Sequence, residues 1–324
     1  MKRITVVACL LAFVCASSVE AQYKPKRINK AVELLEQGQP IYYTAGRGGF
    51  DEGVKMAQTY ADYINYELEH GAFDMTALRQ FMLGLIKGGP TKSGHRTPGV
   101  IVTLPVTGLD EITMRTNVWV IQQVLATGVH GILLCHARVP EAARVLVEAT
   151  RYPFAPKAAG LAEGLRGSGS QGFAAQVWGI PAGEYLRKAD VWPLNPDGEI
   201  LLGLKIEDRH ALANSEKSTK VPGIGFAEWG PGDMAWSLGI VNFGSAGKKG
   251  GGGGGGAGGG RMAPEMLKAR ARVLAACKAA KIAFLNSVNE NDVEEMIKEG
   301  VMVGSGGQAA ADKGRKFSKR EMPW

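Results

Sequence analysis

Two short apolar runs, Leu201–Ile206 and Pro222–Ala227, organise the hydrophobic pattern of the chain. Each run precedes an acidic residue near a polar or glycine-rich turn, Glu207 after the first and Asp233 after the second. Side chains alternate along a strand, so one face of the first run is aliphatic and the other carries glycine, Lys205 and Glu207. We expect the aliphatic face to pack under helices. Carboxylates at the ends of neighbouring parallel strands suit Mg²⁺ or Mn²⁺, which prefer oxygen ligands.

The rest of the chain alternates between strand and helix patterns. With the two runs above there are about eight strand candidates, and alternation of this kind is typical of parallel strands. Eight strands close a (β/α)8 TIM barrel, and the length of 324 residues fits one. An open doubly wound sheet is the alternative, although only Gly46–Gly49 approximates its phosphate-binding fingerprint. The other strand candidates are 41–45, 62–68, 99–104, 129–135, 282–286 and 301–304, and the helix candidates are 29–37, 51–60, 74–87, 113–126, 140–150, 263–280 and 289–298.

Residues 1–21 have the pattern of a secretory signal peptide. Lys2 and Arg3 precede the apolar run Ile4–Cys15, and small residues lead to Ala21. We therefore expect a periplasmic or secreted protein with no membrane segment after signal cleavage. The expected barrel spans 22–310, with an irregular insertion at 152–198, a Gly-rich loop at 244–260 and a basic tail at 311–324. For the Gly-rich loop, a tolerated disordered insertion is favoured over a lid.

Composition narrows the classes of function. The formal net charge is +7, and the basic residues are scattered apart from Lys313–Arg320, so we expect no nucleic-acid partner and read that segment as a solvated tail. Cys135 and Cys277 lie in apolar segments and would remain after signal cleavage. Buried free thiols are favoured there over a single disulfide.

Polar side chains collect where the predicted strands end, which is where barrel enzymes place their active sites. The convergence of several strand ends favours a site, although each residue alone also fits a structural role. These side chains are Glu67, Glu69, His70, His136, Lys205, Glu207, Trp229 and Asp233.

Several motifs, in order and at matching spacing, resemble one family. They are Asn29–Pro40, Asp62–His70, Gln122–Leu134, Ala149–Pro153 and Gly230–Gly239, of which the last, with Gly-Pro-Gly-Asp, is the most specific. Together they resemble the HpcH/HpaI aldolase/citrate lyase family of phosphoenolpyruvate/pyruvate-binding barrels. The resemblance runs from about residue 28 to 304 and implies a (β/α)8 barrel that is usually a homo-oligomer.

The resemblance also implies chemistry. Glu207 and Asp233 match the positions that hold a divalent metal, Mg²⁺ or Mn²⁺, which stabilises the enolate of a 2-oxo acid during aldol cleavage or addition. His70 matches the acid/base histidine, with Glu67 and Glu69 beside it. The backbone around Gly230 and Gly232 would lie against the substrate carboxylate, and Trp229 and His136 are further candidates for substrate contact.

Two departures mark a divergent member. The arginine that stabilises the enolate in the family falls at Leu104 here, and a second family acid falls at Ala126. Lys205 shares a face with Glu207 and is our candidate replacement, although an ion pair with a structural role remains open. We expect an exported metal-dependent carbon–carbon lyase acting on a small 2-oxo acid or hydroxy acid. The alternatives are different lyase or decarboxylase chemistry on a non-pyruvyl substrate, and a non-catalytic ligand-binding barrel.

Overall fold

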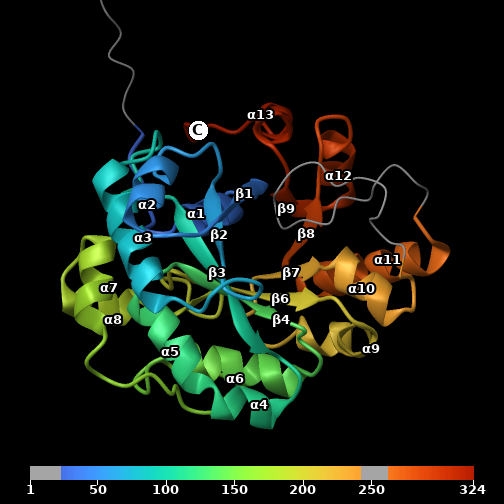
Figure 1. Cartoon of the computed structure of the whole chain (residues 1–324), viewed down its shortest axis with the longest axis horizontal. Coiled ribbons are helices and arrows are strands. Elements are labelled where there is room, and N and C mark those ends of the chain that lie inside the picture. The colour runs from blue at the N-terminus through green and yellow to red at the C-terminus, as the bar shows by residue number, and fades with distance from the viewer. Residues whose placement is uncertain (1–22, 242–261) are drawn as a thin grey trace, which may run out of the picture.

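A closed barrel of eight parallel strands forms the centre of the computed structural model, which describes residues 23–241 and 262–324 (Figure 1). Neighbouring strands pair in the order β1, β2, β3, β4, β6, β7, β8, β9, and β9 pairs with β1 to close the ring. The two-residue β5 (Val191–Trp192) pairs only with the start of β6. The barrel strands are β1 (Ile41–Gly46), β2 (Tyr63–Glu67), β3 (Gly99–Thr107), β4 (Gly131–Cys135), β6 (Ile200–Ile206), β7 (Phe226–Trp229), β8 (Ala283–Ser287) and β9 (Val301–Ser305).

Helices surround the strands, to the left, below and to the right of them in Figure 1. Aspartates start several of the helices: Asp74, Asp110 and Asp208 each accept a hydrogen bond from a backbone N–H of the first turn. The helices are α1 (Lys30–Glu36), α2 (Phe50–Met56), α3 (Met75–Gly88), α4 (Glu111–Thr116), α5 (Val118–Ala126), α6 (Pro140–Thr150), α7 (Gln171–Trp178), α8 (Ala182–Lys188), α9 (Arg209–Ser218), α10 (Pro231–Ser237), α11 (Pro264–Ala280), α12 (Val293–Glu299) and α13 (Gln308–Phe317).

The interior of the barrel is filled by side chains in layers. Tyr43, Ile101, Leu201 and Phe226 belong to a buried cluster that also includes apolar residues of α1. A Cβ on Gly203 would lie 2.2 Å from the Phe226 ring, so only glycine leaves room for the ring at that level. The aliphatic face of β6 packs in the larger cluster that includes helix residues, as the alternation predicted.

Helix α1 closes the amino-terminal end of the barrel. Asn29 caps this helix, and its side-chain amide donates to the backbone carbonyls of His130 and Glu199, each just before a strand. Further polar groups gather at this end, where Asp62 lies within 3.2 Å of cationic groups of Lys30, Arg315 and Arg320. Polar contacts therefore close the amino-terminal end of the barrel, and the candidate active site lies at the opposite end.

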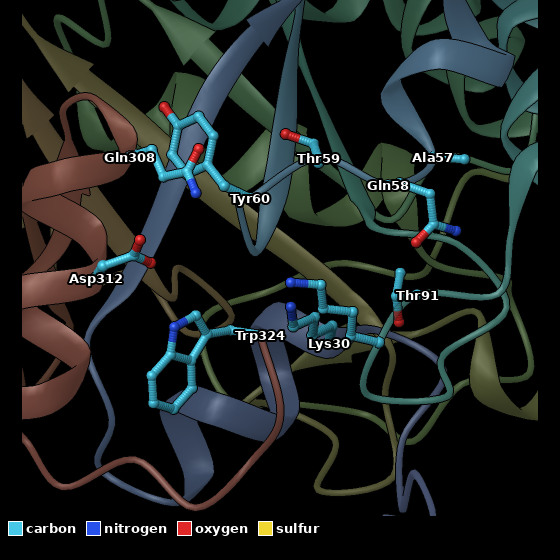
Figure 2. Close-up of a pocket in the computed structure, with 10 residues that line it drawn as sticks. Lys30, Ala57, Gln58, Thr59, Tyr60, Thr91, Gln308, Asp312 and Trp324 are labelled. Atoms are coloured by element: carbon cyan, nitrogen blue, oxygen red, sulfur yellow. The ribbon is translucent and has the colours of Figure 1, made fainter.

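A polar pocket opens beside this amino-terminal cluster. In the view of Figure 2, Lys30 lies between Trp324 on one side and Thr91 on the other, with Tyr60 and Asp312 nearby. Its cavity is about 190 Å³. Because Thr91 and Tyr60 precede β3 and β2, the pocket lies at the end of the barrel remote from the strand ends that carry the candidate site.

Three sequence predictions need correction. The single helix predicted at 113–126 is two helices, α4 and α5, separated at Asn117. The segment 152–198 is not simply irregular, because it contains α7 and α8, with α7 packed on α5. Residues 311–324 are not a solvated tail, because α13 includes the buried Arg315 and Arg320 follows it, also buried.

Other predictions are confirmed or lie outside the described residues. Cys135 and Cys277 are buried free thiols. Within residues 23–241 and 262–324, no helix is long and apolar enough to cross a bilayer. The predicted signal peptide, 1–21, and the Gly-rich loop, 244–260, lie outside the described residues.

Candidate active site

The carboxyl ends of β2 and β6 bring a lysine and two acidic side chains together. Lys205 Nζ lies 2.7 Å from a carboxylate oxygen of Glu69 and 2.9 Å from Oε2 of Glu207. All three side chains are at most 11% exposed. Two segments that are 136 residues apart in the chain thus form one charged network inside the mouth of the barrel.

This network keeps Lys205 charged. Burial disfavours its ammonium, but the neighbouring Cys135 and the surrounding carboxylates outweigh burial and raise the pKa of Lys205. Burial also raises the pKa of Glu207, an effect that Lys205 partly offsets. For Glu69 burial acts in the same direction, but Lys205 outweighs it, and the pKa of Glu69 is lowered. A lysine held as an ammonium is a cation and a hydrogen-bond donor, not a nucleophile.

A second group of side chains adjoins Glu207. One imidazole nitrogen of His136 and carboxylate oxygens of Glu207 and Asp233 lie within 4.8 Å of one another. The backbone N–H of His136 donates to Glu207 Oε1 at 2.9 Å. Because Oε2 faces Lys205 and Oε1 faces His136, the two oxygens of Glu207 serve different neighbours.

These residues fit a divalent cation. Glu207 is 1% exposed, and its Oε2 contacts Lys205 without the geometry of a hydrogen bond to any described residue. Lys205 already occupies the space between Glu69 and Glu207, so the side toward His136 and Asp233 suits the cation. Two carboxylates and an imidazole are an ordinary donor set for such ions.

Glu67 and His70 lie at the rim. Glu67 ends β2, and its Oε1 accepts the backbone N–H groups of Glu69 and His70. His70 Nδ1 is 3.6 Å from Glu69 and 3.8 Å from Glu67, and its side chain is 68% exposed. The predicted trio is therefore assembled, with the imidazole open to solvent and connected to Lys205 through Glu69.

The two glycines of the Gly-Pro-Gly-Asp turn have different surroundings. A Cβ on Gly230 would lie 2.5 Å from Glu207 Cβ and 2.7 Å from its Oε2, so this glycine leaves room for the carboxylate. A Cβ on Gly232 would meet nothing within 4 Å. Close packing on Glu207 thus accounts for Gly230, while Gly232 is exposed in the first turn of α10.

We expect Gly230→Ala to displace the Glu207 side chain and weaken binding of Mn²⁺ about 10-fold or more, because a shifted ligand loses its geometry. Gly232→Ala is the matched control and should bind the ion within about twofold of the unsubstituted protein, because space is free there. Isothermal titration of both variants with Mn²⁺ measures the difference. Equal affinities in the two variants would contradict the expected displacement.

The candidate Trp229, and Leu104 at the position of the missing arginine, face away from the barrel interior. Trp229 is 3% exposed in the layer between strands and helices, where it lines a cavity of about 380 Å³ with Pro231 and Arg270. Leu104 is fully buried in the same layer. Leu104 therefore does not occupy a place beside the Lys205 network, and Ala126 ends α5 just before β4, at the other end of the barrel.

Two acids of the site, Asp208 and Glu228, were not predicted from the sequence. Asp208 accepts hydrogen bonds from Arg138 Nε and two backbone N–H groups of α9, and its Oδ2 is 3.1 Å from His136 Nδ1. Glu228 is paired in register with Lys205 on the neighbouring strand and is 8% exposed. The position of Asp208 directly before a helix could have indicated it from the sequence. Glu228 could have been found because it lies two residues after Phe226 and so shares a face of β7 with it.

Burial raises the pKa of Glu228 to about 8, so its side chain is largely neutral at pH 7. The folded protein then holds a proton that the unfolded chain releases near pH 4.5, and stability falls as pH rises from there to about 8. We expect Glu228→Gln to remove this dependence. The free energy of unfolding of this variant, relative to that of the unsubstituted protein, should rise by about 3–4 kcal/mol between pH 5 and pH 8.

Urea unfolding at the two pH values measures this prediction. The exposed Glu163→Gln is the control and should show no such change. A pH-independent difference for Glu228→Gln would mean that Glu228 is already ionised at pH 5.

Comparison with known proteins agrees with this fold. The chain is 36% identical over 120 residues to the hydroxypyruvate/pyruvate aldolase of Deinococcus radiodurans, a match that spans 37% of each protein. It is 26% identical over 229 residues to the hydroxypyruvate/pyruvate aldolase of Roseobacter denitrificans, spanning 67% of this chain and 72% of that protein. No family model matches the chain.

Among solved structures, an HpcH/HpaI aldolase/citrate lyase family protein from Burkholderia cenocepacia superposes with a TM-score of 0.64. It is 18% identical, and the match covers 90% of this chain and 97% of that one. The barrel fold is therefore shared over nearly the whole length of both chains. The similarity to the two aldolases is a similarity of sequence. In sequence the chain is similar to hydroxypyruvate/pyruvate aldolases, and in fold it is similar to a protein of the HpcH/HpaI aldolase/citrate lyase family.

Proposed function

We propose that the protein is a metal-dependent carbon–carbon lyase of the aldolase type. Its substrate would be a hydroxylated 2-oxo acid or a related hydroxy acid, cleaved to an aldehyde and the enolate of a smaller 2-oxo acid. The observation that carries the proposal is the fixed ammonium of Lys205 beside Glu207, with Asp233 and His136 on the other side of that carboxylate. The two curated relatives described above are named hydroxypyruvate/pyruvate aldolases, which supports the same reaction class.

Cleavage next to a carbonyl needs a stabilised oxygen anion. The substrate hydroxyl gives up its proton, the carbon–carbon bond breaks, and its electron pair becomes the enolate of the 2-oxo acid. Glu207 and Asp233 would hold a divalent cation, which supplies a Lewis acid for the carbonyl oxygen. Lys205 adds a positive charge and a hydrogen-bond donor on the neighbouring side, in a site shielded from water.

A residue at the rim of the barrel is the proposed acceptor of the substrate hydroxyl proton. His70 is exposed at the mouth of the barrel and lies within 3.8 Å of both Glu67 and Glu69. We assign it the substrate hydroxyl proton, because a ring nitrogen of histidine can accept a proton and return it in acid–base catalysis. Glu69 contacts both His70 and Lys205, so it would align the proton acceptor with the cation side of the site.

Two further properties belong to the proposal. The pattern of residues 1–21 supports export to the periplasm or outside the cell. The family resemblance supports a homo-oligomer. Cell fractionation tests the proposed export. Size-exclusion chromatography with light scattering tests the proposed homo-oligomer.

The central test is a retro-aldol assay on the purified protein. A panel of 4-hydroxy-2-oxo acids is incubated with Mg²⁺ or Mn²⁺, and pyruvate is followed by coupled reduction while the aldehyde is trapped separately. We expect equal amounts of both products, loss of activity with a chelator, and loss in Glu207→Ala. Pyruvate with carbon dioxide in place of an aldehyde would indicate a decarboxylase. Metal binding without turnover across the panel would overturn the lyase assignment and favour a binding protein.

A further inference from the structure

His136 has an unusual backbone that directs it toward Glu207. It follows β4 directly and has a φ of 45°, the left-handed region that non-glycine residues rarely adopt, although histidine and asparagine adopt it more readily than most. Its backbone N–H donates to Glu207 Oε1 at 2.9 Å, and its ring Nε2 lies 3.8 Å from the same oxygen. The side chain is 23% exposed, so the ring is open to the mouth of the barrel.

The other ring nitrogen is fixed by Asp208. Oδ1 of Asp208 accepts two backbone N–H groups at the start of α9, and Oδ2 accepts Arg138 Nε at 2.8 Å. Oδ2 also lies 3.1 Å from His136 Nδ1. An ionised carboxylate only accepts hydrogen bonds, so Nδ1 carries the hydrogen. In a neutral imidazole the lone pair is then on Nε2, on the side of Glu207 and Asp233.

The spacing of the three groups suits ligation of one ion. An imidazole nitrogen and a carboxylate oxygen bound at about 2.0–2.2 Å lie roughly 3–4 Å from each other around a metal. The corresponding atoms of His136, Glu207 and Asp233 lie within 4.8 Å of one another, and small rotations of the side chains would bring them to that spacing. A carboxylate behind a ligating histidine is the usual way in which proteins orient the ring.

We propose that His136 is a third protein ligand of the divalent cation, through Nε2, with Asp208 as its positioning residue. This inference rests on the proposed function, which assigns Glu207 and Asp233 to the cation. It also predicts which ion is preferred. A nitrogen ligand favours Mn²⁺, Co²⁺ or Zn²⁺ over Mg²⁺, which prefers an all-oxygen environment.

Binding of Mn²⁺ and Mg²⁺ to the purified full-length protein tests the proposal without any substrate. His136→Asn removes the imidazole but retains a residue that tolerates the left-handed backbone. We expect this variant to bind Mn²⁺ about 10- to 100-fold more weakly, with Mg²⁺ affinity changed by less than about threefold. Pulsed electron paramagnetic resonance of bound Mn²⁺ should show nitrogen coupling in the unsubstituted protein and none in His136→Asn.

Three further variants complete the experiment. Asp208→Asn should weaken Mn²⁺ binding about 10-fold, because the ring loses its carboxylate partner. His210→Ala is the matched control and should bind normally, since its side chain is exposed and only its backbone contacts Asp208. Glu207→Ala distinguishes failure of ligation by His136 from failure of the proposed metal site as a whole. If it abolishes binding while His136→Asn binds normally and nitrogen coupling is absent, ligation by His136 is wrong. If Glu207→Ala also binds normally, the proposed metal site itself is wrong.

Discussion

Lys205→Met is expected to lower kcat for carbon–carbon cleavage about 100- to 1000-fold, the usual cost of removing one group that stabilises a developing oxygen anion. The ammonium is held 2.7 Å from Glu69 and 2.9 Å from Glu207, so it needs no rearrangement when charge develops on the substrate. Methionine has a similar length and no charge. Binding of the metal should be retained or strengthened, because the ammonium no longer competes for Glu207.

Steady-state kinetics of the retro-aldol reaction, with Mn²⁺ titration alongside, measure both effects. Lys188→Met is the matched control, because Lys188 also faces a buried glutamate, Glu199, at 3.8 Å but lies at the other end of the barrel. It should retain kcat within about twofold. Borohydride treatment with pyruvate should trap no adduct on Lys205, since the surrounding acids keep the amine protonated. A kcat for Lys205→Met near that of the control would show that the lysine has only a structural role.

Sequence alone predicted those site residues whose orientation follows from the alternation of side chains along a strand. The alternation along β6 placed Lys205 and Glu207 on one face, and the structure has both on the interior side of the barrel. The same rule would have found Glu228, but the predicted strand ended at Ala227, two residues before the observed end. The observed β7 runs from Phe226 to Trp229, so Glu228 is within it and Trp229 faces the helices.

Contacts between distant loops were not predictable in this way. The interaction of His136 with Asp208 joins residues 72 positions apart, and no local pattern specifies it. The carboxyl-terminal segment shows the same limit: its basic composition is typical of a solvated surface, yet Arg315 and Arg320 are buried because Asp62 lies between them. Burial of a cation depends on a partner that sequence composition does not reveal.

Asp62→Ala is expected to destabilise the protein by about 3–5 kcal/mol, because removal of one member of a buried ionic group leaves the others without compensation. Asp62 is fully buried at the amino-terminal end of the barrel. Its Oδ1 lies 3.2 Å from Lys30, 3.2 Å from Arg315 and 2.8 Å from Arg320, and its Oδ2 accepts the backbone N–H of Tyr42. Loss of this carboxylate would leave three buried cations together and one strand without its hydrogen bond.

Urea unfolding at pH 7 measures the change, with Asp312→Ala as the control. Asp312 also contacts Arg315, at 3.1 Å, but is 33% exposed, so its loss should cost about 1 kcal/mol or less.

The pH dependence of stability gives an independent check. Burial alone would raise the pKa of Asp62, but the neighbouring Arg320, Lys30 and Arg315 outweigh it and lower that pKa well below its ordinary value. The stabilisation is therefore present above the unfolded pKa and lost as pH falls through the folded one. Asp62→Ala should accordingly lose less stability than the unsubstituted protein on acidification, and equal losses in the two proteins would show that the carboxylate does not hold this cluster together.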